Sequence, residues 1–400
     1  MTTDVPALMI NQYRPREYAD VRELLAELQP TEPVYLFSRD RLLRRVRSFQ
    51  QGFPGTVGYA VKANSEPRVI RAMARQGVRH FDVASLGEVS VIAGMCPQAS
   101  LHFNNPVKAV DAINAAYFDY GVRSFALDEM AEFDKIRKGT GAAKDVMYSV
   151  RFKLEHEGAS YDFGSKFGAT PDKAANLLRM IAAFGARPAL TFHPGSQCSE
   201  PRMYARYLEA AAGISAASGV EIAQINVGGG FPERYEKAGV PPLDCYFAAI
   251  NEAMARCFDR PPPLMCEPGR ALVAASVSLL ARVIHVREDQ HALFVNDGVY
   301  GGMLEQSVVD LSLPTALWRN GARPTGIAED YAVFGPTCDP VDRLARRVRM
   351  PCQVEEGDYI EFGLMGAYAS ATSTGFNGFR SSAYFNVARG FSSRADQASC

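Results

Sequence analysis

Two kinds of apolar pattern alternate along the middle of the chain. Short runs rich in β-branched and aromatic residues alternate with longer segments whose apolar residues recur at helical spacing. The short runs predict eight strands, at residues 56–63, 80–85, 101–105, 124–128, 146–153, 189–196, 225–230 and 264–270. The segments between them predict seven helices, at residues 66–76, 87–95, 106–118, 128–138, 171–184, 200–218 and 243–258.

This alternation indicates an α/β fold. Eight strands joined by helical crossovers over about 215 residues predict a parallel (β/α)8 barrel of the TIM type. An open doubly wound sheet also fits the periodicity, but the number of strands favours the barrel.

The pattern changes on both sides of the predicted barrel. A strand at 34–37 and a helix at 39–50 precede it. After residue 271 the helical spacing fades, and short β-type runs follow at 277–285, 292–295, 331–334 and 359–362. We therefore expect a barrel domain at 38–272 and a mostly β domain formed by residues 1–37 and 273–400.

Polar residues lie at or near the carboxyl ends of the predicted barrel strands. They are Lys62, Asp82, Asn105, Arg151, His193, Gly228 to Gly230 and Glu267. Active sites of (β/α)8 barrels are built at this edge, and buried polar groups cost free energy unless they are paired. A buried lysine has a lowered pKa and becomes a nucleophile, although Lys62 alone could also extend to solvent from a strand end.

Composition excludes several other classes of protein. The chain has 47% hydrophobic and 22% charged residues and a net charge of −1, so nothing indicates nucleic-acid binding. We see no signal peptide, and the apolar runs are too short for a membrane span. The eight cysteines and six histidines are scattered without metal-binding spacing. We expect a cytoplasmic protein with reduced thiols and no catalytic metal.

Several short motifs suggest anion and cofactor binding. The three glycines at 228–230 let backbone N–H groups approach a phosphate, although a tight turn would use them too. Glu267 and Arg270 could bind a ligand or pair with each other. His193 could stack on a flat ring, or it could be an ordinary core histidine. A strand-end lysine, a glycine turn, a stacking histidine and a carboxylate are together what pyridoxal phosphate requires.

Cys338 and Asp339 lie in a turn of the expected β domain. They could serve as an acid and a cation binder, or be a buried cysteine beside a turn aspartate.

The whole set of motifs resembles the fold-type III pyridoxal-phosphate decarboxylases with an alanine-racemase-like barrel. The similarity is to the ornithine/lysine decarboxylase branch and spans about residues 34–379. It rests on YAVKAN (59–64), FDVASLGE (81–88), NNPVK (104–108), SKFG (165–168), HPGS (193–196), VGGGFP (227–232), CEPGR (266–270), NDGVYG (296–301), GPTCD (335–339) and GAY…FNGF (366–379).

The resemblance implies roles for residues at matching positions. Lys62 would form the Schiff base, His193 would stack on the cofactor ring, and Glu267 would bind the pyridine nitrogen. The phosphate would be held by Ser196, Gly228, Gly229, Gly230, Arg270 and Tyr368. The cofactor side of the barrel would be lined by Asp82, Glu88 and Arg151.

The resemblance also implies a homodimer with shared active sites. Cys338, from the partner subunit, would protonate the substrate after CO2 loss, and Asp339 would bind the distal ammonium group. Phe376 would border the substrate pocket. A second substrate-binding aspartate is expected where this chain has Val309, so the next residue, Asp310, is the candidate ligand.

One further departure from the family pattern, and several alternative functions, bear on the expected activity. Pro194 stands where the family has an apolar residue such as valine. The expected reaction is decarboxylation of a basic L-amino acid, ornithine or else lysine. The alternatives are decarboxylation of diaminopimelate or another unusual amino acid and, in a different class, a non-catalytic relative that binds a partner protein. The Asp339-Pro340 pair argues against diaminopimelate, because that branch prefers Glu-Ser after the cysteine.

Overall fold

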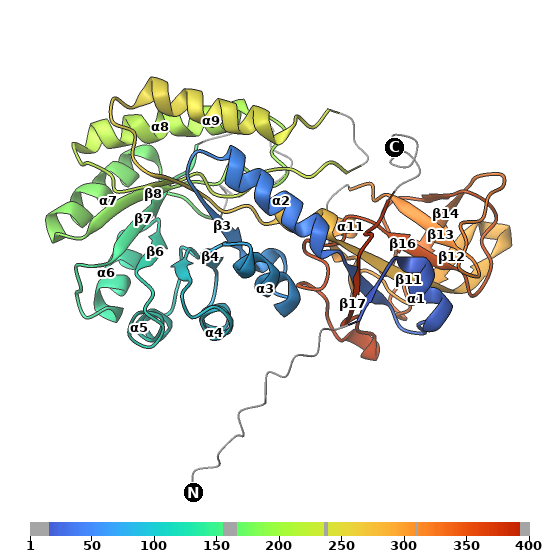
Figure 1. Cartoon of the computed structure of the whole chain (residues 1–400). Coiled ribbons are helices and arrows are strands. Elements are labelled where there is room, and N and C mark those ends of the chain that lie inside the picture. Colours follow the sequence, from blue (N-terminus) through green and yellow to red (C-terminus); the bar gives the residue numbers. More distant parts are fainter. Residues whose placement is uncertain (1–15, 155–165, 236–238, 309–310, 393–400) are drawn as a thin grey trace, which may run out of the picture.

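A closed barrel and a separate, mostly β region make up the molecule (Figure 1). The computed structural model describes residues 16–154, 166–235, 239–308 and 311–392. Eight parallel strands close the barrel in the order β10-β3-β4-β5-β6-β7-β8-β9. They are β3 (Thr56–Ala60), β4 (His80–Val83), β5 (Ser100–Phe103), β6 (Ser124–Leu127), β7 (Met147–Arg151), β8 (Arg187–Thr191), β9 (Ile225–Asn226) and β10 (Leu264–Cys266). The predicted fold class is confirmed.

Helices surround the barrel on its outer side (Figure 1). They are α2 (Arg39–Gly52), α3 (Pro67–Arg75), α4 (Leu86–Met95), α5 (Val110–Phe118), α6 (Met130–Gly139), α7 (Pro171–Phe184), α8 (Arg202–Ser218), α9 (Leu243–Cys257) and the short α10 (Arg270–Val273). Local sequence sets where they begin. At α4, Ser85 accepts a hydrogen bond from the Glu88 N–H, and the Glu88 carboxylate accepts one from the Ala84 N–H at 2.6 Å. This reciprocal cap assigns Glu88 a structural task.

The barrel strands are shorter than the apolar pattern predicts. We expected a strand at 56–63, but β3 ends at Ala60 and a 3-10 turn, η1 (Val61–Ala63), follows it. Val61 and Ala63 remain in the core, with 0% and 1% exposure, so the apolar pattern continues after the hydrogen-bonded ladder has ended. Lys62 is therefore in this turn, and His193 and Glu267 likewise follow their strands rather than belong to them.

The β region contains a nine-stranded sheet. Its strands are β1 (Glu17–Tyr18), β2 (Val34–Phe37), β11 (Val277–Arg287), β12 (Ala292–Val295), β13 (Thr315–Trp318), β14 (Glu329–Phe334), β15 (Val348–Met350), β16 (Tyr359–Phe362) and β17 (Ala383–Val387). The helices α1 (Val21–Glu27) and α11 (Leu304–Val308) and the 3-10 turns η3 (Ala274–Ser276), η4 (Glu288–Gln290) and η5 (Phe376–Gly378) accompany it. The sequence pattern missed β1, β13, β15, β17 and α1, because strands of two to five residues give little periodicity.

Strand β2 joins distant parts of the chain. It pairs antiparallel with β11 and parallel with β17. All four of its residues are buried, because both faces of the sheet are covered here. Tyr35 and Phe37 belong to the main core, whereas Val34 and Leu36 pack into a smaller cluster with α1.

The β region reaches the barrel at the turn that carries Lys62. The Tyr368 N–H donates to the Ala63 carbonyl at 2.9 Å, and the Asn64 side-chain amide donates to the Gly366 carbonyl at 2.9 Å. A Cβ atom on Gly366 would lie 1.8 Å from the Val273 carbonyl oxygen, so only glycine fits this approach. The carboxyl edge of the barrel strands is thus where the two parts meet.

Candidate active site

Lys62 forms an ion pair with Asp82 at the barrel mouth. Its Nζ lies 3.6 Å from Asp82 Oδ2, which is on β4. The Lys62 side chain is 49% exposed because it faces an open cavity, whereas Asp82 is 6% exposed. The Asp82 charge raises the pKa of Lys62 above its usual value, although burial acts in the opposite direction. Our expectation that burial lowers this pKa is therefore wrong, because the neighbouring carboxylate outweighs desolvation.

Glu267 is a buried carboxylate just after β10. Its Oε1 accepts hydrogen bonds from the side-chain amides of Asn226, at 2.6 Å, and Asn104. Burial, together with the charge of Asp82, raises the pKa of Glu267 to about 8. Sequence analysis missed both asparagines, although each lies at or directly after the end of a barrel strand. Their positions at the ends of barrel strands were the sequence signal that could have identified them as site residues.

His193 presents a neutral imidazole to the same region. Its Nδ1 accepts the Gly195 N–H at 3.1 Å, which places the ring proton on Nε2. Burial and the positive charges of Arg151 and Lys62 lower the pKa of His193 well below its usual value. Arg151, the last residue of β7, lies with its guanidinium 5.4 Å from the Phe167 ring centroid. A neutral ring of this kind can stack on a flat cofactor.

The glycine turn leaves no room for side chains. A Cβ on Gly228 would lie 2.1 Å from the Phe192 carbonyl oxygen, and one on Gly230 would lie 2.4 Å from the Gly195 carbonyl oxygen. Both glycines have positive φ, +68° and +87°. Only glycine meets these two constraints, and the absence of side chains lets a ligand approach the backbone closely.

Arg270, the first residue of α10, is held from three sides. It donates to Glu305 Oε2 at 2.7 Å and to the Tyr235 hydroxyl at 2.7 Å. Its guanidinium lies 5.0 Å from the Tyr368 ring centroid. Sequence analysis did not identify Glu305 or Tyr235, since Glu305 is on the five-residue α11 and nothing in the spacing links the three.

These side chains converge on one cavity. The predicted residues that line it are Lys62, Asp82, His193, Ser196, Gly229, Gly230, Glu267, Arg270 and Tyr368. An amine, a glycine cradle beside an arginine, a neutral imidazole and a buried carboxylate fit the aldehyde, phosphate, ring and ring nitrogen of pyridoxal phosphate.

The predicted substrate residues form a second group, outside this cavity. Cys338 is exposed, and its N–H donates to Asn377 Oδ1 at 3.3 Å. The Tyr300 hydroxyl donates to Asp339 Oδ2 at 2.5 Å, and the Tyr300 ring centroid lies 4.6 Å from that of Phe376. Cys338, Asp339 and Phe376 are not among the residues that line the barrel cavity.

A buried aspartate, Asp342, fixes the loop of this second group. Its Oδ1 accepts the Val299 N–H at 2.8 Å, and its Oδ2 accepts the Thr337 hydroxyl at 2.7 Å. It therefore ties the NDGVYG and GPTCD segments together. Sequence analysis overlooked Asp342. Asp310, the other candidate substrate ligand, lies outside the residues that the structure describes.

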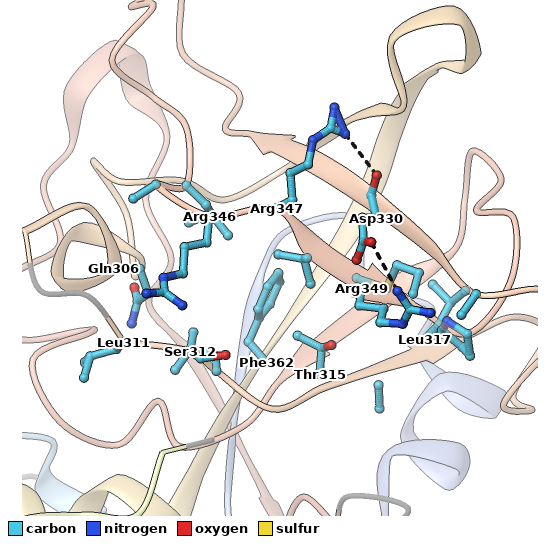
Figure 2. Close-up of a pocket in the computed structure, with 18 of the residues that line it drawn as sticks. Gln306, Leu311, Ser312, Thr315, Leu317, Asp330, Arg346, Arg347, Arg349 and Phe362 are labelled. Carbon is cyan, nitrogen blue, oxygen red and sulfur yellow. Dashed lines mark hydrogen bonds and ion pairs between the residues drawn. The ribbon is translucent and has the colours of Figure 1, made fainter. Parts of the chain in front are cut away.

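A larger cavity, of about 610 Å³, lies within the β region (Figure 2). Its lining includes Phe362, Arg346 and Arg349, and Arg349 pairs with Asp330 at 3.2 Å. None of the predicted site residues that the structure describes lines it. We therefore place the candidate active site in the smaller cavity, where the buried charges converge.

Within the described residues, no group of three or more histidine, cysteine, aspartate or glutamate side chains is arranged to hold a metal ion. No helix in the described part of the chain has the length and apolar character needed to cross a membrane.

Comparison with known proteins gives consistent matches. Residues 39–274 match the family described as "Pyridoxal-dependent decarboxylase, pyridoxal binding domain". The chain is 32% identical to a lysine/ornithine decarboxylase of Selenomonas ruminantium, over 89% of this chain and 87% of that protein. It is 29% identical to antizyme inhibitor 2 of Xenopus laevis, over 90% of this chain and 83% of that protein.

A solved structure shares the whole architecture. The arginine decarboxylase of Paramecium bursaria Chlorella virus, bound to agmatine, superimposes with a TM-score of 0.82 at 26% identity. The match covers 92% of this chain and 99% of that one. Together with the family match over the barrel, this shows that the chain belongs to the pyridoxal-dependent decarboxylases and that pyridoxal phosphate is its cofactor.

Proposed function

We propose that this chain decarboxylates a basic L-amino acid to a diamine and CO2, with ornithine as the first candidate substrate and lysine as the second. The observation that carries the proposal is the single cavity in which the Lys62–Asp82 pair meets Glu267 and Arg270. The similarity to a lysine/ornithine decarboxylase and to an arginine decarboxylase supports a basic substrate.

The cofactor, when bound, supplies an electron sink for the electron pair released by loss of the carboxylate. Lys62 would hold its aldehyde carbon, His193 would stack on its ring, and Glu267 would face its ring nitrogen. The phosphate would be held by Ser196, Arg270, Tyr368 and the glycine turn at 228–230, while Asp82 and Arg151 supply charges around the ring end.

Lys62 must lose a proton before its amine can act as a nucleophile. Because Asp82 raises the pKa of Lys62, the amine is held as an ammonium ion at neutral pH. Attachment of the cofactor therefore becomes faster as the pH rises.

The substrate end would be completed by the second group of residues. Cys338 would donate a proton to the substrate Cα, and Asp339 would bind the distal ammonium, with Phe376 and Asp310 beside it. The hydrogen bond from Tyr300 lowers the pKa of Asp339, which keeps this carboxylate ionised for a cation. Since Cys338 and Asp339 lie outside their own chain's cavity, they support a homodimer in which each subunit completes the other's site.

Two other functions are less well supported. A diaminopimelate decarboxylase would need a further cation for the second carboxylate of its substrate, and Asp339 is followed by Pro340 rather than serine. A partner-binding relative is a real alternative, since one similar protein is named an antizyme inhibitor. The intact set of Lys62, Glu267 and Cys338 supports catalysis instead.

One assay tests the proposal. CO2 release is measured from the protein with pyridoxal phosphate and, in separate reactions, L-ornithine, L-lysine, L-arginine, the D-forms and meso-diaminopimelate. Turnover of L-ornithine or L-lysine above the others is expected. Turnover of diaminopimelate alone would replace the proposed substrate, and a protein that takes up no cofactor and releases no CO2 would support the partner-binding alternative.

We also propose a cytoplasmic location. The seven cysteines within the described ranges form no disulfide bond, which is typical of proteins in reducing compartments. Fractionation of the source cells with an antibody against the chain tests this, and recovery outside the cytoplasmic fraction would contradict it.

A further inference from the structure

The guanidinium of Arg270 is already engaged by an acidic residue of its own chain. Glu305 contacts it with both carboxylate oxygens: Oε2 accepts from Nη1 at 2.7 Å, and Oε1 accepts from Nη2 in a shorter contact. The two side chains are 7% and 12% exposed. A two-point pair in such a dry site is among the strong hydrogen-bonded ion pairs of proteins.

The donors of Arg270 are limited in number. A guanidinium has about five N–H groups in a fixed plane. Both Nη1 hydrogens are directed to Glu305 and to the Tyr235 hydroxyl, and Nη2 gives one more to Glu305. Glu305 therefore occupies one of the two-donor edges of the guanidinium, and a phosphate can bind at two points only through the N–H groups left on Nε and Nη2.

The charges also oppose a second anion at this place. Glu305 neutralises Arg270, and the phosphate of pyridoxal phosphate carries between one and two negative charges near neutral pH. Among the residues that line this cavity, Arg270 and Lys62 are the only cations, and Lys62 is paired with Asp82. A phosphate that binds at Arg270 must share the guanidinium with Glu305 or displace it.

We propose that Glu305 competes with the cofactor phosphate for Arg270 and thereby weakens the affinity of this chain for pyridoxal phosphate. This inference rests on the proposed phosphate-binding role of Arg270. Glu305 is on α11, in the β region, and this helix ends shortly before Asp310 in the sequence. The affinity for the cofactor would therefore depend on the position of α11. Glu305 is a determinant of cofactor exchange and has no part in the proposed chemistry.

The test compares two ligands that differ only in the phosphate. Dissociation constants of pyridoxal phosphate and of pyridoxal are measured by absorbance titration of the cofactor-free protein. Glu305→Gln removes the negative charge and keeps the shape of the side chain. Its constant for pyridoxal phosphate is expected to fall about tenfold or more, while that for pyridoxal stays unchanged.

Arg270→Gln separates this inference from the function on which it rests. Arg270→Gln should weaken the binding of pyridoxal phosphate and leave the binding of pyridoxal unchanged. Adding Glu305→Gln to the Arg270→Gln variant should not tighten the binding of pyridoxal phosphate. If Arg270→Gln leaves both constants unchanged, the phosphate role of Arg270 is wrong. If Arg270→Gln behaves as expected but Glu305→Gln leaves the pyridoxal phosphate constant unchanged or raises it, the competition is refuted.

Two further variants serve as a control and as a second test. Asp358→Asn neutralises another buried carboxylate of the β region that pairs with an arginine, Arg319, at 2.8 Å. It should leave both constants as in the wild type. Glu305→Asp keeps the charge but withdraws it by one methylene, and it should give a smaller gain than Glu305→Gln. This variant decides the question if Glu305→Gln fails to fold, since an unchanged or raised constant then refutes the competition.

Discussion

The barrel mouth and the Cys338 loop hold the two halves of the proposed chemistry in opposite physical settings. At the mouth, Asp82 and Glu267 are nearly buried, and groups of the same chain contact each of them. In the loop, Cys338 is exposed and Asp339 is only partly covered. A single chain thus completes the region proposed to hold the cofactor, whereas the region proposed to select the substrate still lacks a facing surface.

Removal of Lys62 is expected to have the largest effect of any single change. Lys62→Ala deletes the only amine in the barrel cavity lining, so covalent attachment of the cofactor should be lost and CO2 release should fall about a thousandfold or more. The visible absorption band of the attached cofactor reports this directly. Retention of that band in Lys62→Ala would break the assignment of the barrel mouth as the attachment site.

Mixing two inactive variants tests whether the exposed region serves a partner. Lys62→Ala and Cys338→Ala homodimers should each be nearly inactive. If subunits exchange at random, half of the dimers carry one intact site, so about a quarter of the wild-type activity should return. Activity is measured after equilibration of equal amounts. Cys338→Ala mixed with itself is the control, and no recovery despite demonstrated subunit exchange would place both residues in the same chain's site.

The same substitution, carboxylate to amide, should act differently in the two regions. Glu267 has a pKa of about 8 in the folded chain and about 4.5 when unfolded, so its ionisation destabilises the fold. This destabilisation is absent below pH 4.5 and complete only above pH 8. Glu267→Gln should therefore raise the unfolding free energy of the cofactor-free protein by up to about 4 kcal/mol at pH 8 and by little at pH 4.5. Urea unfolding at both pH values measures this.

Asp339→Asn is the matched change in the exposed loop. Because hydrogen bonds lower the pKa of Asp339, the change should lower the urea midpoint slightly and equally at the two pH values, both of which lie above that pKa. It should also raise KM for a diamino acid, because the loop loses the charge proposed to bind the distal ammonium. Equal stability effects of the two amide substitutions would contradict the contrast between the regions.

Asp82→Asn should cause the smallest shift, and only in a pH profile. Asp82 raises the pKa of Lys62, so its removal lowers that pKa and makes the free amine available at lower pH. The rate of cofactor attachment, followed by absorbance, should therefore rise at a lower pH than in the wild type. A profile displaced to higher pH would show that Asp82 does not set the charge of Lys62.

The sequence was informative where one residue type is tied to one position along a strand. Lys62, Asp82, His193 and Glu267 were all expected at the barrel edge, because parallel strands bring their carboxyl ends together. Their exact backbone setting was not predicted. The apolar residues Val61 and Ala63 extended the strand pattern past its last ladder bond.

The partners of these residues could not be predicted in the same way. Asn104 contacts Glu267 across 163 positions of sequence, and Tyr300 meets Asp339 across 39. Such pairs depend on the direction of side chains from loops of different length, which periodicity does not encode. The Arg270–Glu305 pair is of this kind, because it depends on how α11 packs against the barrel.

The position of β2 between β11 and β17 also orders the events of synthesis. The barrel strands end at Cys266, so the barrel can close while the remaining residues are still being translated. β2 then has to wait for β11, and for Ala383–Val387 near the far end of the chain, before its backbone bonds are satisfied. The sheet that holds the Cys338 loop therefore forms after the barrel, and a chain stopped before residue 383 would carry all eight barrel strands beside an incomplete sheet.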